Sequence, residues 1–177
     1  MLKRKMLDTL REWKRSHGTE CLLINGARQV GKSFIVREFG RSEYESFVDI
    51  DFIEDPQLKS IFDGSLSAEN IYSRMTLLIP GVRLVPGKTL VFLDELQECP
   101  AARAAFKYLA QDGRFDVIGS GSLLGMRFRQ LDDAPSLAVG YERQVTMRPL
   151  DFEESQESAS SAICPPQAAG VMTEPDS

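Results

Sequence analysis

The chain has 177 residues, of which 42% are hydrophobic and 27% are charged, and its 21 basic and 26 acidic residues give a net charge of -5. This length is enough for one α/β-sized domain and too short for two large ones. No apolar run approaches the roughly 18 residues of a membrane-spanning helix, and charged residues interrupt the stretch in which a secretory signal would need its apolar segment. We therefore expect a cytoplasmic protein that makes no membrane contact.

The cysteine pattern gives no sign of a disulfide framework or a zinc site. Cys21, Cys99 and Cys164 are few, odd in number and far apart, and no two of them have C-x-x-C spacing. Zinc sites and the disulfide frameworks of small secreted domains need more cysteines at closer spacing. We expect ordinary reduced thiols.

The first predicted element is an amphipathic helix. Leu2, Met6, Leu10 and Trp13 recur at helical spacing and share one face. The rest of its surface is rich in lysine and arginine, which leaves two interpretations open: a patch for nucleic acid or an acidic partner, or a solvated face opposite the core. Charge runs are usually solvated, so we favour the second.

A phosphate-binding loop follows this helix. An apolar strand is predicted over residues 21–24 and a helix over residues 33–39, and the segment between them matches G-x-x-x-x-G-K-[ST] in full. Glycines let the backbone wrap closely around phosphate oxygens, and a helix N-terminus presents aligned N–H groups. The predicted nucleotide-binding residues are Gly26, Ala27, Arg28, Gln29, Val30, Gly31, Lys32, Ser33 and Phe34, with Lys32 reaching the β and γ phosphates and Ser33 binding Mg²⁺. The alternative is a glycine turn without ligand.

A second acidic motif lies further along the chain. After a half-buried edge strand at 47–51 and a helix at 67–79, an apolar strand at 90–93 ends in Asp94 and Glu95. The carboxyl end of a parallel strand lies at the same sheet edge as the phosphate loop. We expect Asp94 to hold the water shell of Mg²⁺ and Glu95 to polarise the attacking water.

The remaining elements are a helix at 100–111, an interior strand at 115–118 and an edge strand at 143–147. Ser120 follows the interior strand, where it would contact the attacking water or a phosphate oxygen as a sensor, or simply serve a turn. For Ser122 we favour an N-cap of a helix that starts at Leu123. The alternation of these elements predicts an α/β fold.

The end of the chain differs in composition from the rest. Residues 151–177 contain six acidic and no basic residues, which leaves the first 150 residues with a net charge of +1. From residue 155 onward serine, alanine, proline and glutamine dominate and aromatic residues are absent, so little apolar surface is available for burial. We expect a folded domain over residues 1–154 and a disordered, acidic, low-complexity tail over residues 155–177.

Four segments together resemble the prokaryotic AAA-type ATPases that usually carry an appended C-terminal domain of unassigned function. These segments are LINGARQVGKS at 23–33, FLDELQ at 92–97, GSGSLLG at 119–125 and RPLDFEE at 148–154. The resemblance covers about residues 1 to 154. It implies a three-layer α/β/α P-loop NTPase fold of AAA+ type with a mostly parallel five-stranded sheet in the order 5-1-4-3-2.

The resemblance also implies roles for single residues. Lys32 and Ser33 take the Walker A positions, Asp94 and Glu95 take the Walker B positions, and Ser120 takes the sensor position on the fourth strand. The implied ligands are ATP and Mg²⁺. AAA-type sites often lie between subunits, so a homo-oligomer or a protein partner is implied as well.

The sequence departs from this family in two places. Many relatives have a basic residue directly after the glycine that precedes the last strand, whereas this chain reads Gly140-Tyr141-Glu142-Arg143. The arginine finger is therefore unassigned, and its candidates are Arg127, Arg129 and Arg143. After Glu154 the family continues into a helical region and a further domain, and here we expect no lid, which would lower turnover more than binding.

The leading functional hypothesis is a Mg²⁺-dependent ATPase module that hydrolyses ATP to ADP and phosphate. The runner-up is a truncated nucleotide-binding switch or interaction module with little turnover. The adjacent Asp94 and Glu95 argue against a P-loop kinase, because the second acid suits water activation. A GTPase is disfavoured because no Asn-Lys-x-Asp motif occurs. Nucleic-acid handling depends on the basic first helix alone.

Overall fold

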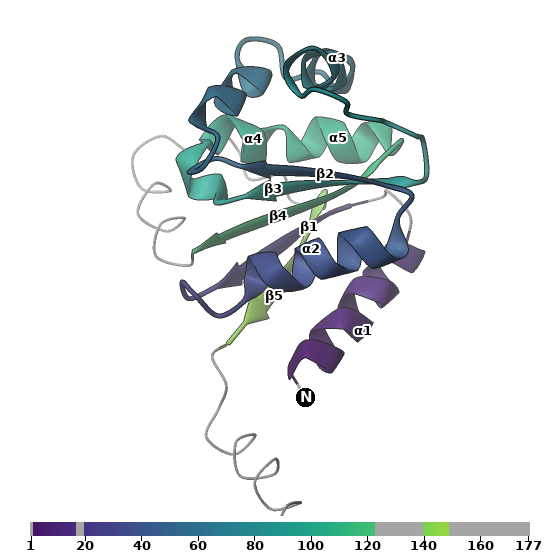
Figure 1. The fold of residues 1–177 in the computed structure, drawn as a ribbon, viewed down its shortest axis with the longest axis vertical. Helices are drawn as coiled ribbons and strands as arrows, with labels where there is room; N and C mark the ends of the chain where they lie inside the picture. Colours follow the sequence, from purple (N-terminus) through teal and green to yellow (C-terminus); the bar gives the residue numbers. More distant parts are fainter. Residues whose placement is uncertain (1, 17–19, 123–139, 149–177) are drawn as a thin grey trace, which may run out of the picture.

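The computed structural model describes residues 2–16, 20–122 and 140–148 (Figure 1). Its strands form one sheet in the order β2-β3-β4-β1-β5, and every neighbouring pair is parallel. Their bounds are β1 Cys21–Gly26, β2 Ser46–Asp51, β3 Thr89–Asp94, β4 Asp116–Ser122 and β5 Glu142–Met147. The predicted order 5-1-4-3-2 is confirmed, since it is the same order counted from the opposite edge.

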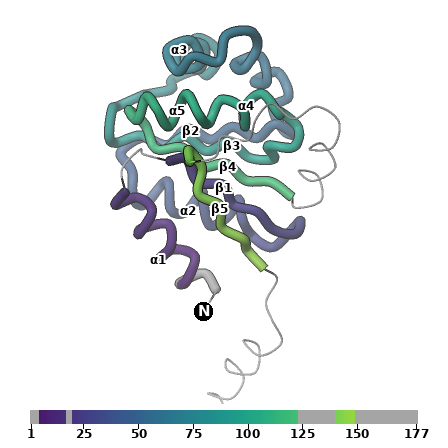
Figure 2. The backbone as a smooth tube through the Cα atoms, turned by 180° about the vertical axis from the view of Figure 1, so that it is seen from behind, coloured from purple at the N-terminus to yellow at the C-terminus, as the bar shows by residue number. Residues whose placement is uncertain are grey.

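Helices cover both faces of this sheet, which makes the fold the predicted three-layer α/β/α sandwich (Figures 1 and 2). Helices α1 (Leu2–Arg15) and α2 (Lys32–Glu43) lie on one face. The other face carries α3 (Ala68–Leu78), α4 (Pro100–Ala104) and α5 (Phe106–Asp112). In the described part of the chain, no helix has the length and apolar character needed to cross a lipid bilayer.

The structure differs from the predicted elements in three respects. The helix expected at 100–111 is divided by a turn at Ala105, where the N–H of Tyr108 donates to the carbonyl of Ala105 at 2.9 Å. Two 3₁₀ helices, Pro56–Phe62 and Leu96–Glu98, were not predicted, because runs this short leave no periodic signal. Strand β4 extends through Ser122, since both of its neighbours continue to pair with it beyond residue 118.

Ser122 is the last residue of β4, and an N-cap residue has the same extended backbone, so its interpretation as an N-cap stays a prediction. The helix that it was expected to cap would begin at residue 123, outside the described residues. The predicted tail at 155–177 lies outside them as well, and so do Arg127, Arg129 and Cys164. Cys21 and Cys99 are both free and buried, in agreement with reduced thiols.

Each face of the sheet has its own hydrophobic core. The α1 and α2 side buries Met6, Leu10 and Trp13 from the predicted stripe of the first helix, together with strand residues such as Ile24 and Phe92. The opposite side packs α3, α4 and α5 over alternate residues of the same strands. The three middle strands, β3, β4 and β1, are covered on both faces, which explains the nearly continuous apolar sequences of β3 and β1.

Leu10 tests the packing of α1 against the sheet. Its side chain is fully buried, so Leu10→Ala is expected to lower the free energy of unfolding by about 2 to 5 kcal/mol through lost burial and an unfilled cavity. Urea denaturation followed by circular dichroism measures this loss. The same truncation at Leu77, whose side chain is 82% exposed, is the control and is expected to change stability by no more than about 0.5 kcal/mol. Equal effects of the two truncations would contradict the position of α1.

Candidate functional site

The predicted phosphate loop connects the end of β1 to the start of α2. Gly26 is the last residue of β1 and Gly31 is the N-cap of α2. Gly31 has φ 86° and Gln29 has φ 61°, so the loop turns twice through the left-handed region. A glycine at position 31 adopts this conformation without the strain that a side chain would add.

Gly26 is required for a different reason, which is the close approach of β5. A Cβ atom at this position would lie 2.4 Å from the carbonyl oxygen of Met147, the last residue of β5. The main chain of the two strands therefore approaches too closely for any side chain. The first glycine of the motif holds the loop against β5.

Gly26→Ala is accordingly expected to push β5 away from β1 and to destabilise the fold by about 1 to 3 kcal/mol, the usual effect of overpacking. Thermal unfolding followed by circular dichroism measures the shift. Gly81→Ala is not a fair control, because Gly81 has φ 72° and would be strained whatever the space. Ala27→Ser is more suitable, since Ala27 is exposed in the same loop. A melting temperature unchanged by Gly26→Ala would contradict the packing of β5 against the loop.

Lys32 begins α2 and folds back over the loop. Its side chain is buried, and its Nζ donates to the carbonyl of Ala27 at 2.7 Å and to that of Gly26 at 3.3 Å. Burial lowers the pKa of Lys32, while the carboxylates of Glu95 and Asp94 act in the opposite direction and stabilise its charge. Lys32 in the loop therefore lies within electrostatic range of the end of β3.

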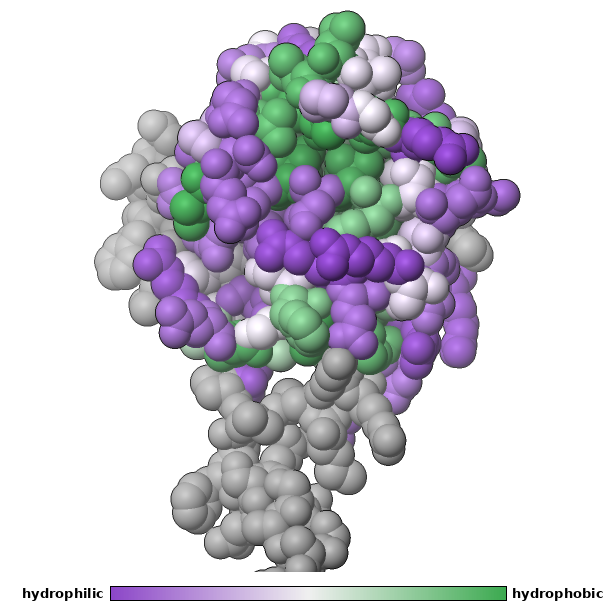
Figure 3. Space-filling model, viewed as in Figure 1, coloured by the Kyte–Doolittle hydropathy of each residue, from purple (hydrophilic) through white to green (hydrophobic). Residues whose placement is uncertain are grey.

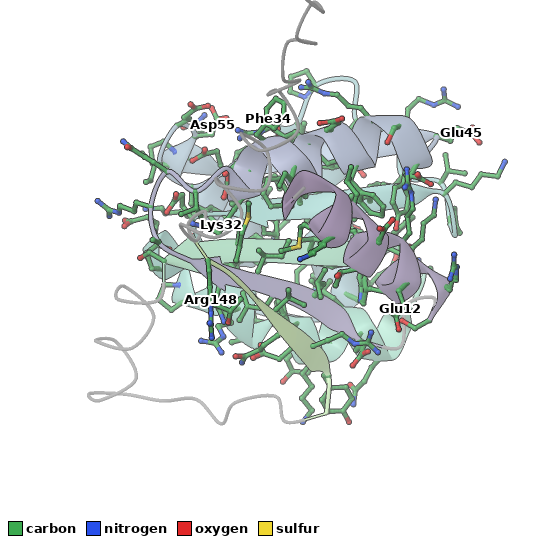
Figure 4. All side chains as sticks on the ribbon, turned by 90° about the horizontal axis from the view of Figure 1, so that it is seen from below. Glu12, Lys32, Phe34, Glu45, Asp55 and Arg148 are labelled. Atoms are coloured by element: carbon green, nitrogen blue, oxygen red, sulfur yellow. The ribbon has the colours of Figure 1, made fainter. Side chains whose placement is uncertain are left out.

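The first turn of α2 directly follows this loop. Among the described residues no side chain caps the helix, and helix N-termini attract anions through their leading N–H groups. Ser33 is half-buried beside Lys32, and Phe34 exposes 63% of its surface. Figure 4 shows Lys32, Phe34 and Arg148 toward one end of the molecule, and Glu12 and Glu45 toward the other.

A hollow of about 540 Å³ lies on α2 next to the loop. It is lined by Phe34, Arg37, Glu38, Arg41 and Ser42. A second groove, of about 330 Å³, lies along β2 and residues 79–83, where Figure 3 shows hydrophobic side chains gathered between α3 and the hydrophilic band across the middle of the molecule. Only the first of these hollows adjoins the phosphate loop.

Asp94 is the last residue of β3 and is almost fully buried. One oxygen of its carboxylate, Oδ1, accepts the hydroxyl of Ser120 and the N–H of Glu95, the latter at 3.1 Å. Ser120 lies on the neighbouring strand β4 and has no exposed surface. The structure therefore brings the predicted sensor serine and the predicted metal-binding aspartate into direct contact.

Glu95 has an unusual backbone for a residue with a side chain. Its φ of 58° and ψ of 49° lie in the left-handed region, which orients the residue immediately after β3. The amide nitrogen of Gln97 donates to the Glu95 carboxylate, and the amide oxygen of Gln97 accepts the N–H of Ser122 at 3.3 Å. Gln97 is buried and joins Glu95, directly after the end of β3, to Ser122 at the end of β4.

Arg37 adds a cation that the sequence analysis missed. It lies on α2, one turn after Ser33, and binds Asp49 of β2 through two contacts, Nε to Oδ2 at 2.7 Å and Nη2 to Oδ1 at 3.5 Å. Its hydrogen bond to Asp49 raises the pKa of Arg37. Nη2 also lies 3.5 Å from Asp51 and 3.6 Å from Asp94.

Asn25 was missed as well. It is the last residue before Gly26, it is buried, and its Nδ2 donates to Oε1 of Gln144 on β5 at 3.3 Å. Its own Oδ1 has no hydrogen-bond partner among the described residues. This amide joins the start of the loop to the neighbouring strand.

The predicted site residues thus gather at the end of the sheet where the strands have their carboxyl ends. The nine loop residues are continuous, and Asp94, Glu95 and Ser120 lie at the carboxyl ends of β3 and β4. Of the three arginine-finger candidates only Arg143 is described; it pairs with Glu20 at 2.8 Å near the amino end of the sheet, away from the loop. On α1, Arg11 lies 2.9 Å from Glu43, and Lys14 pairs with the same glutamate, which favours the solvated-face interpretation of that helix.

A family comparison identifies this combination of fold and loop. Residues 18–156 match the model of a family described as "AAA domain". This match covers most of the chain, and the chain therefore belongs to the AAA family of P-loop ATPases. No curated protein matches it.

Solved structures share the fold at low sequence identity. The ORC2 protein of Aeropyrum pernix, in ADPNP-ADP complexes, aligns with 90% of this chain and 49% of its own at 15% identity, with a TM-score of 0.50. PCH-2 of C. elegans aligns with 91% and 48% at 13% identity (TM-score 0.51), and a chain of Drosophila ORC bound to DNA with 88% and 97% at 13% identity (TM-score 0.51). The chain spans about half the length of the first two.

Proposed function

We propose that residues 1–154 form a module that binds ATP with Mg²⁺ and hydrolyses it to ADP and phosphate. The observation that carries this proposal is the position of Lys32, which lies in the phosphate loop and within electrostatic reach of Asp94 and Glu95. A cation for the phosphates and two carboxylates at one sheet edge are the parts that phosphoryl transfer to water requires.

The donor set fits a magnesium ion. Ser33 offers a hydroxyl at the start of α2, and Asp94 offers the oxygen that Ser120 and Glu95 leave unused. Mg²⁺ prefers such hard oxygen donors and keeps several of its waters. When bound, Mg²⁺ would neutralise charge on the β and γ phosphates.

The chain's own residues would supply the remaining functions. The loop N–H groups and the start of α2 bind phosphate oxygens, and Lys32 exchanges its carbonyl partners for the β and γ phosphates. Glu95, fixed by Gln97, orients the attacking water and accepts its proton. The exposed ring of Phe34, in the hollow beside the loop, contacts the nucleoside.

A nucleotide-binding switch with little turnover is the second candidate. Both acidic residues have protein partners: Asp94 binds Ser120, and Glu95 binds Gln97. Bound in this way, the two carboxylates are less available to a metal ion and a water molecule. A site in this state would retain nucleotide and hydrolyse it slowly.

Titration of the complete chain with ATP and ADP, each with and without Mg²⁺ and alongside a phosphate-release assay, tests the proposal. Binding that Mg²⁺ strengthens, together with steady phosphate release, supports the ATPase. Binding without release supports the switch. If neither nucleotide binds, both candidates are wrong. A parallel titration with GTP measures the expected preference for adenine.

A further inference from the structure

Arg37 is the only described cation that faces the acidic ends of both β2 and β3 on the α2 side of the sheet. Its guanidinium binds Asp49 and lies 3.5 Å from Asp51 and 3.6 Å from Asp94. One positive charge therefore faces three carboxylates. The arginine is held most closely by Asp49, which lies with Asp51 on β2, separated by β3 and β4 from β1 and its phosphate loop.

The contact with Asp94 involves one particular oxygen. Oδ1 of Asp94 is occupied by the Ser120 hydroxyl and the Glu95 N–H, whereas the nitrogen of Arg37 faces Oδ2. Oδ2 is therefore the oxygen left for a metal ion or its water shell. Only 2% of the Asp94 side chain is exposed, so bulk water screens the contact weakly.

We propose that Arg37 competes with Mg²⁺ for Oδ2 of Asp94, and that Asp49 sets the strength of this competition by holding the guanidinium toward β2. This inference rests on the proposed function, since it concerns the metal ion of that site. Arg37 is a positioning residue here: it acts through Asp94 and contacts neither phosphate nor water. The pair of Arg37 and Asp49 thereby tunes the Mg²⁺ concentration at which nucleotide binding tightens.

This role differs from a merely structural one in the direction of its effects. If Arg37 only joined α2 to β2, its removal would loosen the end of β3 and weaken Mg²⁺ binding. If it competes, Arg37→Gln removes a positive charge from beside Asp94 and strengthens Mg²⁺ binding by roughly fivefold, the upper end of what an ion pair with a partly exposed arginine contributes. Asp49→Asn has the opposite effect, because the released guanidinium shifts toward Asp94 and Asp51 and weakens Mg²⁺ binding by roughly threefold.

The experiment measures the binding of a fluorescent ADP analogue to the complete chain across a series of Mg²⁺ concentrations, and the readout is the Mg²⁺ concentration at half-maximal effect. The variants are Arg37→Gln, Asp49→Asn and the double variant. Arg15→Gln, an exposed arginine at the end of α1, is the matched control. Binding of the analogue without Mg²⁺ reports whether the phosphate loop is intact, and thermal unfolding reports whether each variant is folded.

The double variant separates competition from a general loss of negative charge. If Asp49 acts through Arg37, Asp49→Asn has no further effect once Arg37 is absent, and the double variant matches Arg37→Gln. An equal effect of Asp49→Asn in both backgrounds would overturn the proposal, as would weaker Mg²⁺ binding in Arg37→Gln. Loss of Mg²⁺-free binding in Arg37→Gln would show that Arg37 contacts phosphate and would also overturn it.

If Arg37→Gln fails to fold, Asp49→Asn alone tests the proposal, and an unchanged Mg²⁺ response in that variant overturns it. If the unmodified chain binds no nucleotide, the proposed function itself is wrong, and this inference with it.

Discussion

Glu95→Gln is expected to lower phosphate release by roughly 100-fold or more, the usual contribution of a general base, and to leave ATP binding within about twofold of the unmodified chain. The substitution keeps the size of the side chain and removes its negative charge. Gln97 can still bind the amide oxygen at position 95, so the link to Ser122 survives. Single-turnover phosphate release together with equilibrium binding separates these two effects.

Glu98→Gln provides the control for this experiment. Glu98 lies three residues further along the chain and pairs with Lys59 at 3.8 Å, away from the loop. The chemical change is identical, and phosphate release is expected to stay within about twofold. If Glu95→Gln and Glu98→Gln behave alike, Glu95 does not activate water.

Lys32→Ala is expected to weaken ATP binding by roughly 10- to 100-fold, which corresponds to the loss of hydrogen bonds to a charged group. Lys32 lies with its Nζ against two loop carbonyls, in the position from which it would reach the phosphates. Isothermal titration with ATP and Mg²⁺ measures the change. ADP is expected to lose less affinity than ATP, because it lacks the γ phosphate.

Lys88→Ala is the matched control for this second experiment. Lys88 forms an exposed ion pair with Glu45 at 2.9 Å, and Glu45 lies at the end of the molecule opposite Lys32 (Figure 4). Lys88→Ala is expected to leave ATP affinity unchanged within error. An unchanged affinity in Lys32→Ala, with the fold intact, would mean that the loop does not bind phosphate through this lysine.

Much of the architecture was predictable from the apolar pattern. Strands covered on both faces need continuous hydrophobic runs, and β1 and β3 have them. The alternation in β2, with Val48 and Ile50 buried and Asp49 less so, correctly indicated an edge strand. The extension of β4 was missed because glycine and serine carry no strand signal, and its length is set by pairing with β1.

The loop and the two acidic residues were predictable because each belongs to a short contiguous motif. Arg37 and Gln97 were missed because their partners come from other parts of the fold. Arg37 contacts Asp49 and Asp94, which are distant in sequence, and Gln97 contacts the main chain of Ser122. The available signals were weak. Arg37 lies four residues after Ser33 on the same helix, and Asp49 and Asp51 are two residues apart, so they lie on the same face of β2.

The close approach of Gly26 to the carbonyl oxygen of Met147 has a mechanical consequence. The space between the main chain at Gly26 and the carbonyl of Met147 is too small even for a Cβ atom, so a displacement of the loop backbone toward β5 displaces the end of that strand. Met147 is the last residue of β5. Nucleotide binding at the loop would therefore act as a force on the end of this edge strand, and the first glycine of the motif would transmit that force.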